Sequence, residues 1–421
     1  MSIPYSYSVK KGSICSGDVS IAGVAREYGT PCYVYSHDPF RSRSRNLVES
    51  LNTIRSKEVK VFYSMKANPS PVILNWAREA GLHSEVSSMG ELEMALAHGF
   101  DPTDIILLGP GKSRALIEAA MTHRILALVV ESPREAKIAA ELDNGVTRIL
   151  VRINVEQGIP GLDESMIGGV EKFGINASEL GRTLDDLGTV GKDRLGIHYY
   201  LGSQILDHET MLKYHTVLLR EIAAYSDMIG TVDCGGGFGV PYSDGDTELD
   251  LYGFADGFSK LLLSNGLSDK EVWFETGRYV AADCGIFVTT VMDVKKGANG
   301  RTTIITDGGM NDFFRIAFMK ADHPIRLINR LGDDHSNETA ICGPLCTPLD
   351  NFGTSVGLPA GVEEGDLIGI FKAGAYGLSM SPILFLLHSI PKEIAIKDGR
   401  VFPVSKNDLT PFGVYSKILS A

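Results

Sequence analysis

The sequence has few cysteines and does not arrange them for cross-linking. Six cysteines stand among 421 residues, at positions 15, 32, 234, 284, 342 and 346, and no two form a Cys-x-x-Cys pair. A disulfide-bonded extracellular scaffold is therefore excluded, because such scaffolds depend on a dense cysteine framework. No cluster of cysteine and histidine completes a zinc site either, and no metal is predicted.

Concentrated positive charge and long apolar runs are also missing. Forty Lys and Arg face 52 Asp and Glu, for a net charge of −12, and there is no basic block. Nucleic acid and anionic membranes are thus poor partners, since both attract clustered positive charge. No apolar run approaches the roughly 20 residues that cross a bilayer. The first 18 residues lack the apolar core of a signal peptide, so a cytoplasmic enzyme is expected.

What the sequence does contain is a regular alternation over its first two thirds. Short β-rich runs are separated by stretches with helical spacing of apolar residues, such as 90–100 and 211–226. The β-rich runs are 61–67, 84–88, 105–109, 126–132, 148–155, 195–202, 231–237 and 272–279. Eight such units over about 240 residues predict a closed parallel (β/α)₈ barrel. An open doubly wound sheet is the alternative.

The pattern changes near residue 280. Runs of β-branched residues broken by Gly, Asn and Asp follow, without a long helical period between them. We therefore expect an α/β barrel at 36–280 and a C-terminal all-β domain at 281–421. Residues 1–35 form an N-terminal segment that we expect to join the β domain, with the run 31–36 as an added strand.

The predicted carboxyl ends of the barrel strands carry an unusual set of polar residues. They are Lys66, Glu85, His198, the run Gly235–Gly237, and Glu275 with Arg278. Each has an ordinary alternative, namely a solvated lysine, a core histidine, a turn or a structural ion pair. Taken together at the catalytic edge of a barrel, they predict a pyridoxal phosphate site.

Each of these residue types has a chemical reason to be there. A lysine forms a Schiff base with the aldehyde, and that bond then exchanges for the substrate amine. A carboxylate such as Glu275 keeps the pyridine nitrogen protonated, and His198 can stack on the ring. Glycine backbone N–H groups, joined by Arg278 or a hydroxyl, hold the phosphate.

The C-terminal domain adds two loops with reactive side chains. The segment 343–350, GPLCTPLD, places Cys346 and Asp350 between Gly and Pro, and the segment 374–377 places Tyr376 between small residues. A barrel that carries the cofactor still needs a proton donor. These loops are our candidates to supply it.

As a set, these residues resemble the fold-type III pyridoxal phosphate decarboxylases of diaminopimelate, ornithine and arginine, which are related in fold to alanine racemase. The resemblance runs from about residue 30 to the end. It rests on YSMKANP (63–69), SSMGELE (87–93), FG (173–174), GIHYYLGSQ (196–204), CGGGFG (234–239), ETGRY (275–279), DGGMND (307–312), GPLCTP (343–348) and GAYG (374–377). It implies a β-sandwich-like C-terminal domain and a head-to-tail homodimer with shared active sites.

The resemblance also implies residue roles. Lys66 carries the cofactor, His198 stacks on it, and Glu275 pairs with its ring nitrogen. The remaining cofactor-binding candidates are Glu85, Ser203, Gly236, Gly237, Gly277, Arg278 and Tyr376. Cys346 of the partner subunit protonates the quinonoid carbanion after carbon dioxide leaves. The substrate-binding candidates are Asp312, Arg315, Thr347 and Asp350.

Departures from the family pattern bear on the substrate. Diaminopimelate enzymes resemble one another in a Glu after the cysteine, where this chain has Thr347, and in a Pro and a Tyr, where it has Ile316 and Met319. Losing the partner of a buried ammonium weakens recognition of a second amino-acid head.

Residues 343–350, followed by AGAYGLSMSP and by His388 with Pro391, resemble another branch. That branch acts on a carrier-bound glutamyl group in butirosin biosynthesis, or on citryl conjugates in siderophore assembly. We therefore predict decarboxylation of an amino-acid unit within a larger molecule. The alternatives are diaminopimelate itself or a free basic amino acid such as ornithine or lysine. A racemase would need a second acid–base group, and a non-catalytic homologue would have lost Lys66 or Cys346.

Overall fold

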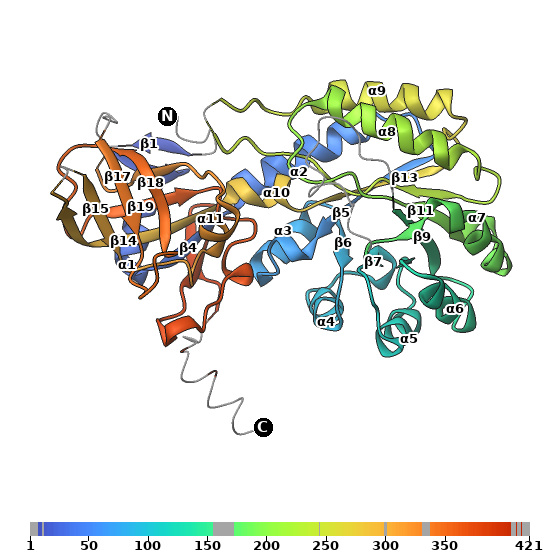
Figure 1. Ribbon diagram of the computed structural model, residues 1–421, viewed down its shortest axis with the longest axis horizontal. Helices are drawn as coiled ribbons and strands as arrows, with labels where there is room; N and C mark the ends of the chain where they lie inside the picture. Colours follow the sequence, from blue (N-terminus) through green and yellow to red (C-terminus); the bar gives the residue numbers. More distant parts are fainter. Residues whose placement is uncertain are drawn as a thin grey trace. The chain divides into compact units, whose positions relative to one another are not determined.

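A computed structural model shows two compact units (Figure 1). It describes residues 7–10, 12–154, 172–243, 245–298, 301–330 and 337–405, with Thr410 and Val414. The barrel unit comprises Arg43–Val240 and Thr247–Tyr279. The β-rich unit comprises the residues up to Ser42, Pro241–Asp246, and the residues from Val280 onward. Residues 36–42 and 241–246 thus group with the β-rich unit. Among the described residues, no helix combines the length and apolarity that a membrane span requires.

The barrel is closed and its eight strands are parallel. In spatial order they are β5 (Glu58–Ser64), β6 (His83–Val86), β7 (Ile105–Leu107), β8 (Ala127–Val130), β9 (Arg148–Asn154), β11 (Leu195–His198), β12 (Thr231–Asp233) and β13 (Glu271–Thr276). Strand β13 pairs with β5, and β8 pairs with β9, which closes the ring. The two-residue β10 (Ile175–Asn176) adds to β9. The predicted barrel is confirmed, and the open sheet is wrong. Val155, at the end of the predicted run 148–155, lies outside the described residues.

Helices cover the outside of the barrel (Figure 1). They are α2 (His37–Leu51), α3 (Pro71–Glu79), α4 (Met89–Ala97), α5 (Arg114–His123), α6 (Pro133–Glu141), α7 (Ala177–Asp186), α8 (His208–Ala223) and α9 (Leu251–Ser264). The local sequence determines where several of these helices begin. Ser88, Ser113 and Ser132 cap α4, α5 and α6 by accepting a backbone N–H three residues on. Inside, Phe62, Leu150 and Trp273 belong to a buried apolar cluster from facing strands.

The β-rich unit is built around the long strand β14 (Gly285–Lys296). It pairs with β4 (Cys32–Ser36), β15 (Thr302–Thr306) and β19 (Leu367–Phe371). The other strands of this sheet are β16 (Ile325–Leu327), β17 (Asn337–Cys342), β18 (Asn351–Leu358), β20 (Lys392–Lys397) and β21 (Arg400–Pro403). The predicted strand at 31–36 is confirmed as β4, which pairs with both β14 and β20. A small sheet, β1 (Ser8–Lys10), β2 (Ser13–Ser16) and β3 (Val19–Ser20), leads into α1 (Ile21–Tyr28).

Candidate active site

Lys66 and Glu85 form an ion pair at the carboxyl end of the barrel. Lys66 lies in the 3₁₀ turn η1 (Met65–Ala67) directly after β5, and Glu85 is opposite Ser64 in the register of β5 and β6. The Lys66 Nζ lies 3.0 Å from Oε1 of Glu85. The Glu85 side chain is buried, whereas that of Lys66 is 46% exposed. The amine therefore sits at the end of a rigid strand, with a fixed carboxylate below it and access from outside.

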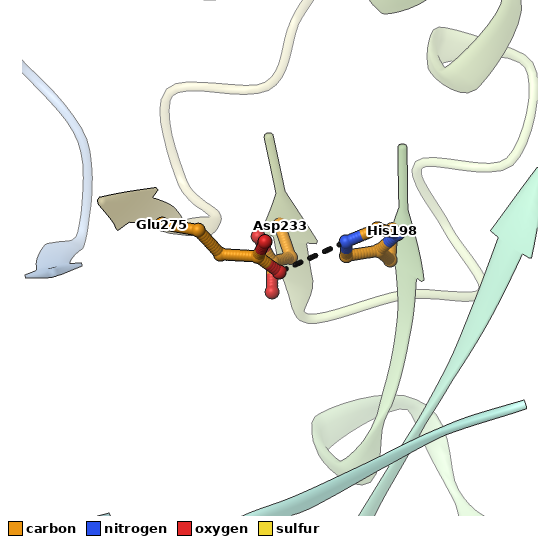
Figure 2. Close-up of side chains that lie close together, drawn as sticks. All are labelled: His198, Asp233 and Glu275. Carbon is orange, nitrogen blue, oxygen red and sulfur yellow. Dashed lines mark hydrogen bonds and ion pairs between the residues drawn. The ribbon is translucent and has the colours of Figure 1, made fainter. Parts of the chain in front are cut away.

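His198, Asp233 and Glu275 converge on neighbouring strands β11, β12 and β13 (Figure 2). One imidazole nitrogen and one oxygen from each carboxyl group all lie within 4.8 Å of one another. Nε2 of His198 is 3.0 Å from Oε1 of Glu275, and Oδ1 of Asp233 accepts from the Gly235 N–H. Nδ1 of His198 and Oδ2 of Asp233 have no hydrogen-bond partner among the described residues. Two buried polar atoms are thus left available to a ligand.

Burial controls the charge of this cluster. Desolvation, with Arg152 as the next cause, lowers the pKa of His198 to about 3. Desolvation raises the pKa of Glu275 and holds that of Asp233 well above its usual value, where the neighbouring Glu275 raises it further. At neutral pH the imidazole is therefore uncharged, and each of the two carboxyl groups binds a proton more readily than an exposed carboxyl group does. Such a pair can share a proton with a basic ring nitrogen.

The glycine run after β12 makes a cradle of bare backbone. Gly235 has φ +61°, and a Cβ there would lie 2.6 Å from the Tyr199 carbonyl oxygen. A Cβ at Gly236 would lie 2.9 Å from the carbonyl oxygen of Glu275. The N–H groups of Gly236 and Gly237 donate to no described residue. These are the features of a backbone anion site.

An arginine and a serine from the strand ends form a second polar pair. Nη2 of Arg278 donates to Oγ of Ser203 across 3.0 Å. Gly277, just before Arg278, is needed for packing, because a Cβ there would lie 2.7 Å from Cβ of Ala67 in η1. The end of β13 and the turn that carries Lys66 are therefore in direct contact.

Two loops of the β-rich unit are joined through Asp350. Its Oδ1 accepts from the Met310 N–H and its Oδ2 from the Leu345 N–H, each across 2.7 Å. Burial raises the pKa of Asp350. Cys346, next to Leu345, is exposed, and Thr347 is half-buried. Both Asp350 oxygens are engaged with the backbone, which is the contact pattern of a loop brace, and the substrate contact expected for Asp350 stays a prediction.

Arg315 and Tyr376 also lie together in the β-rich unit. The Arg315 guanidinium is 5.4 Å from the ring of Tyr242 and 5.7 Å from that of Tyr376. Tyr376 has φ +56°, a left-handed conformation that bulky residues rarely adopt. Asp312, three residues before Arg315, is buried, and its Oδ2 accepts a hydrogen bond from the Gly309 N–H.

The predicted site residues fall into two groups, one in each unit. Lys66, Glu85, His198, Ser203, Gly236, Gly237, Glu275, Gly277 and Arg278 belong to the barrel, and Asp312, Arg315, Cys346, Thr347, Asp350 and Tyr376 to the β-rich unit.

Comparisons with known proteins give this arrangement a family. The model of the pyridoxal-dependent decarboxylase, pyridoxal binding domain, matches residues 38–282. The chain belongs to the pyridoxal-dependent decarboxylases. It is 32% identical over 397 residues to the L-glutamyl-[BtrI acyl-carrier protein] decarboxylase of Niallia circulans. The matched region covers 90% of this chain and 91% of the relative. It is 30% identical to the diaminopimelate decarboxylase of Bacillus subtilis, with 88% and 87% covered.

A solved structure agrees with these relatives. Diaminopimelate decarboxylase from Helicobacter pylori, complexed with L-lysine, superposes with a TM-score of 0.82 at 28% identity, covering 95% of this chain and all of that one. This decarboxylase is thus a fold-type III carboxy-lyase near the butirosin branch, and its cofactor is pyridoxal phosphate. The residues present fit that group, because a bare backbone cradle, a reachable amine and a buried acid pair lie along one barrel edge.

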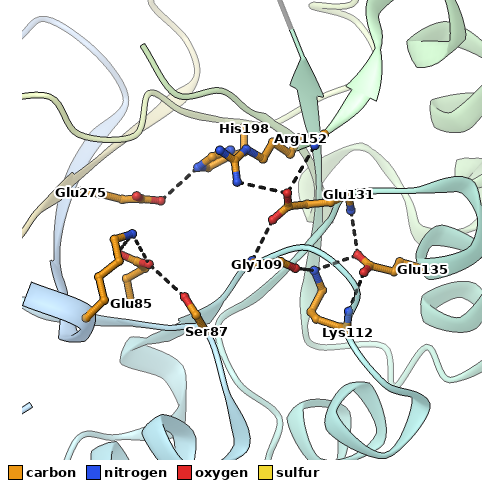
Figure 3. A network of polar contacts seen from close by, with 11 residues as sticks. Glu85, Ser87, Gly109, Lys112, Glu131, Glu135, Arg152, His198 and Glu275 are labelled. Carbon is orange, nitrogen blue, oxygen red and sulfur yellow. Dashed lines mark hydrogen bonds and ion pairs between the residues drawn. The ribbon is translucent and has the colours of Figure 1, made fainter. Parts of the chain in front are cut away.

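The sequence prediction missed part of the decarboxylase's polar interior. Asp233 was not singled out, although it immediately precedes the glycine run. A buried network of Lys112, Glu131, Glu135 and Arg152 was also missed (Figure 3). The sequence signal that could have revealed this network is the pair Glu131, directly after β8, and Arg152, near the end of the adjacent strand β9.

The charge state of Asp312 gives this decarboxylase a measurable pH dependence. Burial raises the Asp312 pKa to about 7, with further contributions from Asp307 and Asp350. A carboxyl with a raised pKa binds its proton more tightly in the folded state, so stability is lost as the pH rises through the folded pKa. Between pH 5 and 8 we expect a loss of about 2–3 kcal/mol from this group. Urea unfolding at both pH values should show it, and D312N should flatten the slope. An equal slope in D312N would contradict the assignment.

Proposed function

We propose that this decarboxylase removes the α-carboxylate of an amino-acid unit whose far end is joined to a larger molecule. The observation that carries the proposal is Thr347, at the position where the family resemblance places a carboxylate in enzymes that act on a second amino-acid head. Its Oγ1 accepts from the Leu349 N–H within its own turn, so it offers no charge to a distal ammonium. The glutamyl-carrier decarboxylase among the relatives acts on such a conjugate.

The barrel residues would bind and orient the cofactor. Nζ of Lys66 would hold it covalently, Glu85 would position that amine, and His198 would face the ring. Glu275, with Asp233 beside it, would keep a proton at the ring nitrogen. The N–H groups of Gly236 and Gly237 would bind the phosphate. Ser203, Arg278 and Gly277 would complete that site, and Tyr376 remains a further predicted cofactor contact. When bound, pyridoxal phosphate supplies the electron sink that lets carbon dioxide leave.

Cys346 would finish the reaction. After the bond between Cα and the carboxylate breaks, Sγ would donate its proton to Cα, and the product amine would then leave. Because Cys346 is exposed, we propose that it serves the barrel of a second copy of the chain. Arg315 and Asp312 would contact the substrate, while Asp350 would brace the cysteine loop.

An exposed apolar patch in the β-rich unit supports a second copy as the partner. The exposed apolar side chains of this unit include Phe318 and Met319 at the end of α11 (Phe314–Met319), Leu349, and Phe385, Leu386 and Leu387, and we propose that together they form this patch. These side chains are 42–66% exposed. The Phe314 N–H donates to Oγ of Ser381, which joins α11 to the segment 381–387. Leu349 lies three residues from Cys346, so covering the patch would bring this loop against the partner.

The substitution L386E should therefore weaken the dimer. A charge in an apolar interface is desolvated without a partner, and we expect the dissociation constant to rise about 100-fold. Light scattering on a sizing column, over a dilution series, measures it. L263E is the matched control, since Leu263 is also exposed but lies on α9 of the barrel unit. Unchanged dimerisation in L386E would contradict the patch as the interface.

A mixed substrate panel tests the proposed function. The cofactor-loaded enzyme is given meso-diaminopimelate, both enantiomers of lysine, ornithine and arginine, and citryl- and carrier-linked amino acids, and carbon dioxide release is recorded. Release from conjugates alone supports the proposal. Efficient release from diaminopimelate, with none from conjugates, would overturn it.

Diaminopimelate is the second candidate substrate. Several relatives with that activity are 29–32% identical over about nine tenths of this chain. Met310, Asn311, Asp312 and Arg315 resemble the pattern of such enzymes, whereas Ile316, Met319 and Thr347 depart from it. The same panel distinguishes the two candidates.

A further inference from the structure

Arg152 is buried beside the candidate cofactor site, and the proposed reaction gives it no role. It lies two residues before the end of β9, next to β11, and its Cα is the register partner of His198. Residues paired across parallel strands point to the same side of the sheet. The guanidinium and the imidazole therefore leave the barrel wall side by side (Figure 3).

Two contacts fix the Arg152 guanidinium. Nη1 donates to Oε2 of Glu131 across 3.1 Å, and the guanidinium carbon lies 4.6 Å from the centre of the Phe173 ring. The side chains of both ion-pair partners are nearly fully buried, at 9% and 1% exposure. A buried pair with good geometry holds its position strongly, because separating it leaves an uncompensated charge.

Glu131 is itself held by the backbone on both sides. Oε1 accepts from the Gly109 N–H at 2.8 Å, and Oε2 also accepts from the Gly174 N–H at 3.3 Å. Gly174 approaches β9 so closely that a Cβ would lie 2.8 Å from the carbonyl carbon of Ile153. The loop with Phe173 and Gly174, the end of β9 and the loop after β7 are thus joined through one carboxylate.

We propose that Arg152, fixed by Glu131 and Phe173, is a positioning residue that holds the His198 imidazole in place and faces it with a permanent positive charge. The role of His198 toward the cofactor rests on the proposed function. A positive neighbour disfavours a second positive charge on the imidazole. An imidazole that stays uncharged does not repel a cationic ring.

The test follows the titration of His198 in the cofactor-free protein. Nitrogen-15 histidine spectra between pH 5 and 8 report the charge of each imidazole, and H198Q identifies the His198 signal. The charged or titratable groups that face His198 are Arg152 from β9, Glu131 beyond β8, Glu85 from β6, Lys66 from η1, Asp233 from β12 and Glu275 from β13. Of these groups, only Arg152 is changed in the main variant, R152M.

We expect His198 to remain uncharged throughout this range in the natural protein. In R152M its titration midpoint should rise, so that protonation begins at the acid end of this range while burial still holds the midpoint below that of an ordinary histidine, and cofactor affinity should fall about tenfold. R152K retains the charge but not the planar fork, so it should keep His198 uncharged and lose part of the affinity. R148M is the matched control. Arg148 begins the same strand and pairs with Glu271 at the other end of the barrel, so its loss should leave both readouts unchanged.

Unchanged His198 titration and cofactor affinity in R152M would overturn the proposal, and so would equal effects in R148M. If R152M does not fold, E131Q replaces it. There, His198 should stay uncharged while cofactor affinity falls, and unchanged affinity would overturn the proposal. Because the titration uses neither cofactor nor substrate, its failure is separate from a failure of the substrate panel.

Discussion

K66A should bind no cofactor covalently and should lose carbon dioxide release by about 10³-fold or more. The reason is that Lys66 offers an amine at the fixed end of β5, paired with Glu85 and open to the outside. Borohydride reduction of the loaded protein, followed by peptide mass analysis, should place the cofactor on the peptide that contains Lys66.

K60A is the matched control for this experiment. Lys60 lies on the same strand, and its side chain pairs with Glu58. It should retain cofactor and activity. A melting curve for K66A checks its fold, because Glu85 loses its partner. Cofactor found on another lysine, or activity that survives in K66A, would contradict the assignment.

C346A should retain the cofactor but slow the reaction by about 10²–10⁴-fold, the usual contribution of a positioned proton donor. Product made in deuterium oxide should also show altered labelling at Cα, because water or another acid would then deliver the proton. C342A is the control. Cys342 lies four residues earlier at the end of β17, and its replacement should leave the rate near that of the natural enzyme.

Mixing the two inactive variants tests whether the sites are shared. A dimer of K66A and C346A subunits has one site with both Lys66 and Cys346 if each site draws on two chains. Random mixing in equal amounts should then restore roughly a quarter of the natural activity. No recovery would count against a shared site, provided that exchange of subunits is shown by differential tags.

The barrel was predictable because hydrophobic patterning and glycine placement are local signals. The residues at which the strands end were harder to predict. The run 231–237 was expected to be one strand, but β12 ends at Asp233, because the backbone at Gly235 and Gly237 turns to positive φ. Similarly, β11 ends at His198 instead of continuing to residue 202.

The missed site residues depend on contacts between strands far apart in sequence. Arg152 faces His198, 46 residues later, only because β9 and β11 pair in one register. Asp350 was predicted from its loop as a substrate contact, and its two bonds to the backbone of Met310 and Leu345 could not be read from the sequence. A sequence pattern names the residue types available, whereas their partners follow from register.

The most direct measurement compares one diamino acid in two forms, free and acylated by citrate at its distal amine. Both have the same α-carbon, so the ratio of their kcat/KM values for carbon dioxide release reports recognition of the far end alone. We predict a ratio of about 100-fold or more in favour of the conjugate. A ratio in favour of the free diamino acid would contradict the proposed function and assign this decarboxylase to free amino acids.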